Sequence, residues 1–163
     1  MFALTSEQKL LQDSVRKLHE KHAPRDYIRR LERESAYPYE LYQAWVDAGL
    51  FGVAFPEKYG GSGGSVLDLF IVVREIAYNS IDFQMSFGGC VFCGLNILRK
   101  GSEEQKEHWL PKLINGERRL SISISEPDAG SDVGAIRTRA VRDGKEFVVN
   151  GQNCGTREPA RAI

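Results

Sequence analysis

The sequence ERRLSISIS, residues 117–125, marks a change in the spacing of apolar side chains. Before this stretch, apolar residues recur every three or four positions, as they do on one face of a helix. Within it, Leu120, Ile122 and Ile124 alternate with serines, which is the period of a strand. The alternation predicts a strand with one apolar and one hydroxyl face. We therefore expect the fold to change from helices to strands near residue 118.

The residues before this point predict helices with defined starts. Thr5 with Gln8, and Ser102 with Gln105, have the spacing of a capping box, in which each side chain bonds the other residue's backbone N–H. A helix that starts at Pro38 is also expected, since proline suits a first helical position. These patterns predict an N-terminal all-α helical bundle.

A glycine-rich segment, residues 52–64, interrupts the helical pattern. Its backbone entropy and scarcity of side chains predict a plain surface loop, and it lacks the Lys-Ser/Thr pair of a phosphate-binding loop. Ser65 then caps a helix in which the apolar residues of 66–76 surround almost the whole circumference. This helix is expected to be buried on most sides.

The residues after 134 predict a β-hairpin. Ile136, Thr138 and Ala140 alternate with polar residues, Asp143-Gly144 is a turn sequence, and residues 147–149 form a second apolar run. Together with the helices, this order predicts an α+β fold in which helices precede antiparallel strands.

Composition excludes several classes of partner. The 163 residues contain 22 Lys or Arg and 22 Asp or Glu, so no net charge attracts nucleic acid or an anionic membrane. No apolar run approaches the roughly 18 residues of a membrane span. The three cysteines, Cys90, Cys93 and Cys154, are too few for a disulfide framework. Since no targeting segment is recognisable, we expect a cytoplasmic protein. We expect it to bind neither nucleic acid nor a membrane.

Most candidate reactive side chains have a structural interpretation. Cys90 and Cys93 form a C-x-x-C pair, but no second pair completes a zinc site, so no metal is expected. The three histidines, His19, His22 and His108, are interpreted as helix-surface residues because none has a catalytic partner at a suitable spacing. The segment SEPDAGSD, residues 125–132, is compatible either with binding of a planar ring or phosphate or with a water-facing edge strand.

The sequence SISEPDAGSDVG, residues 123–134, closely resembles the signature of the acyl-CoA dehydrogenase family. Four other family-like stretches stand in the expected order: LTSEQ at 4–8, FPEKYGG at 55–61, GSEEQK with WLP at 101–111, and VNGQ at 149–152. The resemblance covers residues 1–152. It implies an N-terminal helical domain, 1–117, followed by the opening strands of a β-barrel-like middle domain, 118–152.

The same resemblance implies an FAD-dependent oxidoreductase that converts an acyl-CoA thioester to the 2-enoyl-CoA and passes electrons to a flavin-linked acceptor. The implied cofactor-binding residues are Ile122, Ser123, Ile124, Ser125, Gly130 and Ser131, with the Ser125 hydroxyl and nearby amides on the pyrimidine edge of the flavin. The implied substrate-binding residues are Ser131 near the CoA end, and Gln84 and Gly88 along the acyl chain. No catalytic residue is assigned, because family members carry the catalytic glutamate in a later domain.

The sequence departs from the family after Gln152, so residues 153–163 are interpreted as a non-family tail. Asn153-Cys154-Gly155 can be encoded by AAC-TGT-GGN. One A added before these codons gives AAA-CTG-TGG, which encodes Lys-Leu-Trp, the sequence that family members have at this position. We therefore expect a one-base frameshift and an N-terminal fragment that is inactive alone, from a gene whose full-length product is a homo-oligomer. The alternatives are a non-catalytic helical binding module or decaying gene product, and a flavin-dependent acyl-CoA oxidase or monooxygenase relative.

Overall fold

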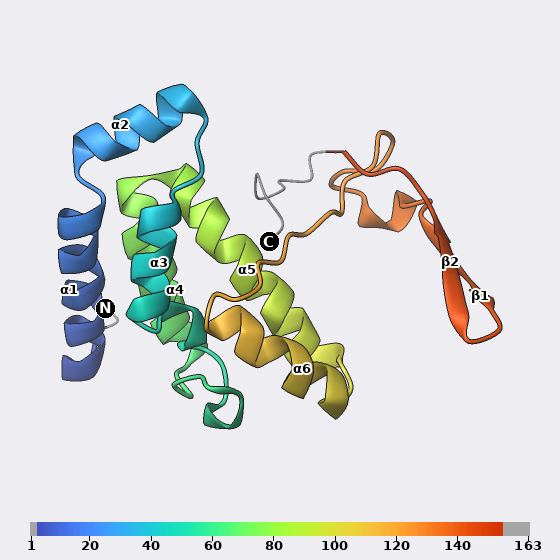
Figure 1. Cartoon of the computed structure of the whole chain (residues 1–163), viewed down its shortest axis with the longest axis horizontal. Helices are drawn as coiled ribbons and strands as arrows, with labels where there is room; N and C mark the ends of the chain where they lie inside the picture. The colour runs from blue at the N-terminus through green and yellow to red at the C-terminus, as the bar shows by residue number, and fades with distance from the viewer. Residues whose placement is uncertain (1–2, 155–163) are drawn as a thin grey trace. The chain divides into compact units, whose positions relative to one another are not determined.

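The structure, a computed structural model, describes residues 3–154 of the chain. These residues belong to two compact units, the first ending at Leu120 and the second starting at Ser121. Figure 1 shows the helices in the first unit and a two-stranded antiparallel sheet in the second. The α+β class is therefore confirmed. Of the predicted tail, only Asn153 and Cys154 lie inside the described residues.

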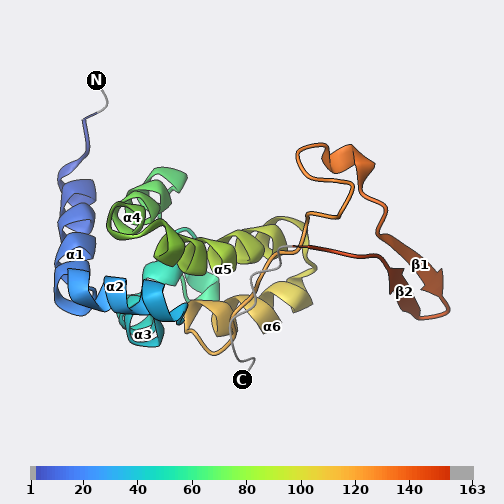
Figure 2. The same ribbon diagram turned by 90° about the horizontal axis from the view of Figure 1, so that it is seen from above.

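The described part of the helical unit contains six α-helices, which pack against one another as a bundle. In chain order they are α1 (Ser6–His22), α2 (Arg25–Glu34), α3 (Tyr39–Asp47), α4 (Val66–Asn79), α5 (Ile81–Lys100) and α6 (Glu103–Ile114). Helix α1 packs along α4, α4 along α5, and α5 along α6. Figures 1 and 2 show α2 crossing from the end of α1 to α3.

Aromatic rings form the centre of this unit. The ring centroids of Phe51 and Phe87 lie 4.7 Å apart, and those of Trp45 and Phe87 lie 5.6 Å apart. All three side chains are fully buried. Since burial of each ring and the contacts between rings both stabilise the fold, this cluster joins α3 and α5 through the short 3₁₀ helix at Leu50–Gly52.

The capping predictions are confirmed. In α1 the Gln8 backbone N–H donates to Thr5 Oγ1 at 3.2 Å, while Thr5 N–H donates to Gln8 Oε1 at 3.2 Å. The same reciprocal pair links Ser102 and Gln105 at the start of α6. These caps satisfy backbone donors that a helix leaves unpaired at its first turn, so the sequence fixes both starts locally.

Two features of the helices differ from the prediction. Helix α2 was missed because its sequence, RDYIRRLERE, carries only two buried apolar residues, Ile28 and Leu31, among many charges. Helix α4 is not buried on most sides: Val66 is 74% and Phe70 is 60% exposed. Its packing against α1 and α5 covers only one side, so part of its apolar circumference faces outward.

By length and composition alone, helix α5 is long and apolar enough to span a membrane, so the expectation that the chain has no membrane span stays a prediction. In this structure it is a core helix, with Phe83, Phe87 and Val91 buried in the bundle. A core helix can also meet these criteria of length and composition, so they are weak support for a membrane span.

The glycine-rich segment forms a loop, as predicted, but it contains a short 3₁₀ helix, Glu57–Tyr59, and is closely packed. Its backbone N–H groups reach back across it: Ser62 donates to the Gly52 carbonyl at 2.9 Å and Gly63 donates to the Phe55 carbonyl at 2.8 Å. The Phe55 side chain is fully buried. The loop is therefore folded onto itself around a core aromatic ring rather than lying loosely on the surface.

A buried carboxylate joins α1 to α4. Glu75, whose side chain is 3% exposed, accepts hydrogen bonds from Gln12 Nε2 at 2.7 Å and Arg16 Nε at 2.7 Å, and pairs with Arg74. Burial raises the pKa of Glu75, but the hydrogen bonds from Arg16 and Gln12 outweigh it and the net pKa is lowered. The ionised carboxylate therefore holds the two helices together.

Replacing this carboxylate should measurably weaken the bundle. The substitution Glu75→Ala should lower the free energy of unfolding by about 2 kcal/mol. This is less than the cost of breaking a fully buried ion pair, because the Arg16 and Arg74 side chains are about half-exposed and regain water. Urea unfolding followed by circular dichroism measures the change. The exposed control Glu107→Ala, in the interior of α6, should leave it nearly unchanged, and equal stability of Glu75→Ala and wild type would contradict the role given to Glu75.

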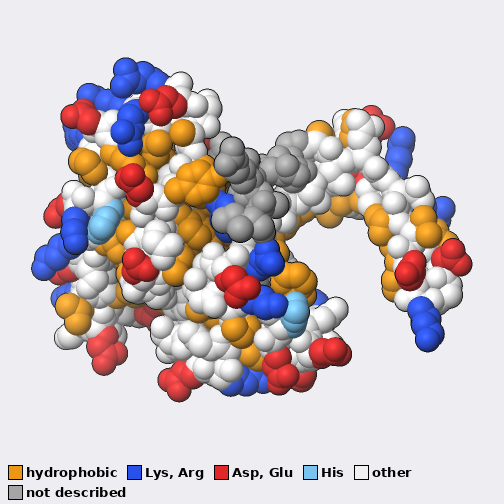
Figure 3. Space-filling model, in the orientation of Figure 1, with side chains coloured by type: hydrophobic (Ala, Val, Ile, Leu, Met, Phe, Trp, Pro, Cys, Tyr) orange, Lys and Arg blue, Asp and Glu red, His pale blue; other side chains and the backbone are white. Residues whose placement is uncertain are grey.

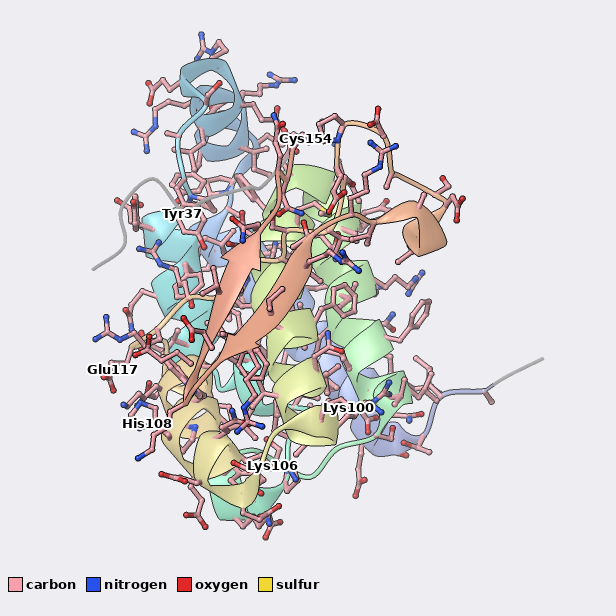
Figure 4. The ribbon with its side chains drawn as sticks, turned by 90° about the vertical axis from the view of Figure 1, so that its right-hand side faces the viewer. Tyr37, Lys100, Lys106, His108, Glu117 and Cys154 are labelled. Atoms are coloured by element: carbon pink, nitrogen blue, oxygen red, sulfur yellow. The ribbon has the colours of Figure 1, made fainter. Side chains whose placement is uncertain are left out.

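The end of the helical unit is held by aromatic rings. The Arg119 guanidinium lies 5.0 Å from the Tyr37 ring centroid and 5.2 Å from that of Tyr39. Tyr37 stands just before α3, as Figure 4 shows. The Cys90 thiol also donates to the Leu120 carbonyl at 3.4 Å. These contacts fix the position at which the chain leaves the bundle.

The second unit contains the predicted hairpin. Strands β1 (Arg139–Asp143) and β2 (Glu146–Asn150) pair antiparallel, and Asp143 lies opposite Glu146 across the turn. Gly144 has a φ of 60°, which glycine adopts readily. The hairpin prediction is confirmed, although the first strand starts at Arg139 rather than near Ile136.

The predicted strand at 120–125 is wrong as a regular element. Within residues 3–154 no strand pairs with it, and Ile122 and Ile124 are 42% and 44% exposed. Its carbonyl groups instead receive separate bonds, including one from the Cys154 N–H to the Ser125 oxygen at 2.8 Å. Alternation in the sequence predicts an extended backbone, but a strand also needs a partner along its length.

Candidate functional site

The loop that follows Ser125 is organised around Glu126. Glu126 is buried, with 7% of the residue exposed. Its Oε2 accepts from the Arg137 N–H at 2.8 Å and its Oε1 accepts from the Thr138 N–H at 2.8 Å. The Thr138 hydroxyl donates to the same Oε1. These hydrogen bonds lower the pKa of Glu126, with the Thr138 hydroxyl contributing most. The side chain is thus an ionised acceptor whose oxygens are occupied within the loop.

The other acidic side chains of the loop are also engaged. Asp132 Oδ1 accepts from the Gly134 N–H at 3.1 Å and caps a 3₁₀ turn at Val133–Ala135. Asp128 forms an exposed ion pair with Arg137 at 3.1 Å. The exposed residues of the loop include Ser125, Gly130 and Ser131, which carry hydroxyl and backbone N–H groups. This is a surface suited to a ligand that accepts hydrogen bonds.

The residues predicted to line a flavin lie along the approach to this loop and at its tip. Ile122, Ser123, Ile124 and Ser125 form the extended approach, and Ser131 is exposed at the tip. A Cβ built on Gly130 would meet nothing within 4 Å, so open space lies beside the Gly130 backbone. The structure gathers these residues in one unit and leaves their proposed cofactor role a prediction.

The residues predicted to contact the acyl chain lie in the other unit, on α5. Gln84 and Gly88 are one helical turn apart and share a face with Phe92. A Cβ on Gly88 would lie 2.6 Å from Gln84 Nε2 and 3.6 Å from the Phe92 ring. Glycine at this position therefore makes room for the Gln84 amide, which is 8% exposed.

The cysteines and histidines do not form a reactive cluster in the described part of the chain. Among residues 3–154, no three His, Cys, Asp or Glu side chains are grouped to hold a metal ion. Cys90 is buried, and burial raises the pKa of its thiol. His108 projects from the surface of α6 (Figure 4), with its Nε2 3.0 Å from Lys112 Nζ.

His19 is a correction to the sequence analysis, which placed it on a helix surface. It is fully buried, and its Nε2 accepts a hydrogen bond from Trp45 Nε1–H at 2.9 Å. The bond requires an unprotonated Nε2, and burial lowers the pKa of His19 to about 4. No local sequence signal pairs two residues 26 positions apart, so this contact could not be predicted.

Comparisons with known proteins agree with the motif order. Residues 5–117 match the family model for the acyl-CoA dehydrogenase N-terminal domain. Mitochondrial isovaleryl-CoA dehydrogenase of Bos taurus is 37% identical over 150 residues, which cover 91% of this chain and 35% of that protein.

Two solved structures resemble the fold closely. A glutaryl-coenzyme A dehydrogenase in complex with glutaryl-CoA is 35% identical, with a TM-score of 0.87 over 93% of this chain and 39% of the other. A glutaryl-CoA dehydrogenase of Mycobacterium smegmatis in complex with FADH2 is 27% identical, with a TM-score of 0.83 over 91% and 38%. The chain thus spans less than half the length of these relatives.

Proposed function

Because the chain belongs to the acyl-CoA dehydrogenase family, we propose that it supplies the N-terminal helices and the first flavin-contacting loop of an FAD-dependent oxidoreductase. The proposed reaction of the whole enzyme is α,β-dehydrogenation of an acyl-CoA thioester to the 2-enoyl-CoA. The relative in complex with FADH2 supports the choice of cofactor.

The observation that carries this proposal is the construction of the loop around Glu126. Its carboxylates are engaged within the loop, while Ser125 and Ser131 are exposed and open space lies beside Gly130. The pyrimidine edge of a flavin offers carbonyl and nitrogen acceptors to such donors. The half-exposed side chains of Ile122 and Ile124 add apolar surface for a planar ring. The residues present therefore fit the cofactor.

We propose that the described residues bind and orient but do not remove the substrate proton. When bound, FAD supplies the acceptor for the hydride that leaves the substrate. The three carboxylates of the loop are all engaged, since Glu126 and Asp132 accept hydrogen bonds and Asp128 pairs with Arg137. Because general-base catalysis contributes about 10²- to 10⁴-fold, this chain alone should show little or no turnover.

The family resemblance also supplies the proposed substrate contacts. Gln84 and Gly88 on α5 would contact the acyl chain, and Ser131 would lie towards the CoA end. A flavin-linked electron acceptor and a homo-oligomeric full-length enzyme complete the proposal.

The cofactor assignment is tested by titrating the ¹⁵N-labelled chain with FAD, riboflavin and ATP. We expect FAD and riboflavin to shift the amide signals of Ser125, Gly130 and Ser131, because both contain the isoalloxazine ring, whereas ATP should not. Dye reduction with acyl-CoA substrates should stay at the background level. Turnover would contradict the proposal that none of the described residues acts as the catalytic base. Titrations without shifts in the loop would favour the alternative, a non-catalytic helical module.

A further inference from the structure

Glu126 holds the two ends of the loop together through hydrogen bonds of both its side chain and its backbone. The carboxylate binds the two residues that lead into β1, namely Arg137 and Thr138. The Glu126 N–H donates to the Ala129 carbonyl at 2.8 Å, and the Ala129 N–H donates to the Glu126 carbonyl at 3.2 Å. One residue thereby fixes both the turn at 126–129 and the point where the chain returns at 137–138.

Gly151 supports the same arrangement from the end of β2. A Cβ on Gly151 would lie 2.0 Å from Thr138 Oγ1 and 2.7 Å from Thr138 Cβ. Any side chain at 151 would displace Thr138, which carries two of the three donors to Glu126. The Glu-Pro and Asn-Gly-Gln stretches, 25 residues apart, therefore meet at Thr138.

A carboxylate is required at this position by the chemistry of its partners. Both carboxylate oxygens of Glu126 accept hydrogen bonds. The backbone N–H groups of Arg137 and Thr138 can donate a hydrogen bond but cannot accept one. In Glu126→Gln, one oxygen becomes an NH₂ group that faces an N–H donor. Because the shape is nearly unchanged, this substitution isolates the acceptor chemistry from the packing.

We propose that Glu126 is a positioning residue for the cofactor, which holds the loop so that the amides of Gly130 and Ser131 present their donors to the flavin. This inference rests on the proposed function, because the ligand is the flavin proposed there. Glu126 acts through the backbone geometry of the loop and does not touch the reacting atoms.

The experiment compares flavin binding by variants of the full chain. Riboflavin and FAD are titrated into the wild type and into Glu126→Gln, Thr138→Val, Thr138→Ser and Glu146→Gln, with ¹⁵N amide signals as the readout. Glu126→Gln should bind about ten-fold more weakly, since it loses a charge-assisted hydrogen bond and places a donor against a donor. Thr138→Val should have a smaller effect, and Thr138→Ser, which keeps the hydroxyl, should bind like the wild type.

Folding is monitored separately from binding. Glu146→Gln is the matched control, because it makes the same chemical change at an exposed position of the hairpin. Hydrogen exchange at the Arg137 and Thr138 amides should become faster in Glu126→Gln, while the signals of the helical unit stay in place. If the signals of the second unit collapse in Glu126→Gln, the comparison of Thr138→Val with Thr138→Ser decides the proposal.

The outcomes separate this inference from the proposed function. A wild-type chain whose loop amides do not respond to either flavin contradicts the proposed function, and the positioning role with it. A wild type that binds flavin, together with a folded Glu126→Gln or Thr138→Val that binds equally well, overturns only the positioning role. Unchanged exchange at Arg137 and Thr138 in Glu126→Gln would also overturn it.

Discussion

Replacing Gly61 with alanine should lower the free energy of unfolding of the helical unit by about 3 kcal/mol. A Cβ at this position would lie 2.1 Å from the Phe55 oxygen, 2.5 Å from the Phe55 carbonyl carbon and 2.7 Å from the Gly52 oxygen. All three atoms are backbone, so no side-chain rotation can relieve the contact. The Gly63 N–H also bonds the Phe55 carbonyl, and a shift of Phe55 would therefore break that bond.

A glycine in a different environment provides the control. Gly89 lies within α5, and a Cβ built there would meet nothing within 4 Å. Gly89→Ala should leave the structure unchanged and stabilise it by up to about 1 kcal/mol, because alanine favours a helix interior. Urea unfolding followed by far-ultraviolet circular dichroism measures both variants. If Gly61→Ala unfolds at the same urea concentration as the wild type, the close packing described for this loop is contradicted.

Lowering the pH from 7 to 4 should destabilise the helical unit by roughly 3 kcal/mol through His19 alone, since its folded pKa is about 4 and its ordinary value is 6.5. Between these values the unfolded chain binds a proton that the folded chain excludes, so acid favours unfolding. The contribution is complete above pH 6.5 and is lost as the pH falls towards 4. In the folded state, a proton on Nε2 would face the Trp45 indole N–H at 2.9 Å.

The substitution His19→Gln tests the origin of this slope. Glutamine retains an oxygen that can accept from the Trp45 indole and does not titrate, so the stability of this variant should change much less between pH 6.5 and 4. His108→Gln changes an exposed histidine on α6 and should keep the wild-type slope. The measurement is the urea midpoint at half-unit pH intervals. A His19→Gln variant as acid-sensitive as the wild type would show that other groups, such as Glu75, set the slope.

The parts of the fold that the sequence predicts are those set by local interactions. The caps at Thr5 and Ser102 involve residues three positions apart, and the hairpin turn at Gly144 needs a backbone that glycine favours. Helix α2 was missed because its apolar face is narrow and charged residues surround it. The exposed side of α4 was missed because the apolar pattern cannot show how many neighbours a helix has.

The candidate site shows the same division. The motif order in the sequence predicted the loop at 125–132 and residues beside it as flavin contacts, and this assignment stays a prediction. The motif order did not identify Glu126 as the residue that closes the loop, because its partners lie 11 and 12 positions away and two of their donors are backbone groups. Backbone donors leave no trace in residue type, so only the folded arrangement reveals them.

The burial of Trp45 also gives the protein an internal optical reporter. The chain has two tryptophans, and the other, Trp109, is 38% exposed on α6. An indole shielded from water emits at shorter wavelength than a hydrated one, so the two emissions report on different places. Trp45 follows the centre of the bundle and its imidazole neighbour, and Trp109 follows the surface. Acid or urea that reaches the core should shift the first emission to longer wavelength, which separates loss of the core from changes confined to α6.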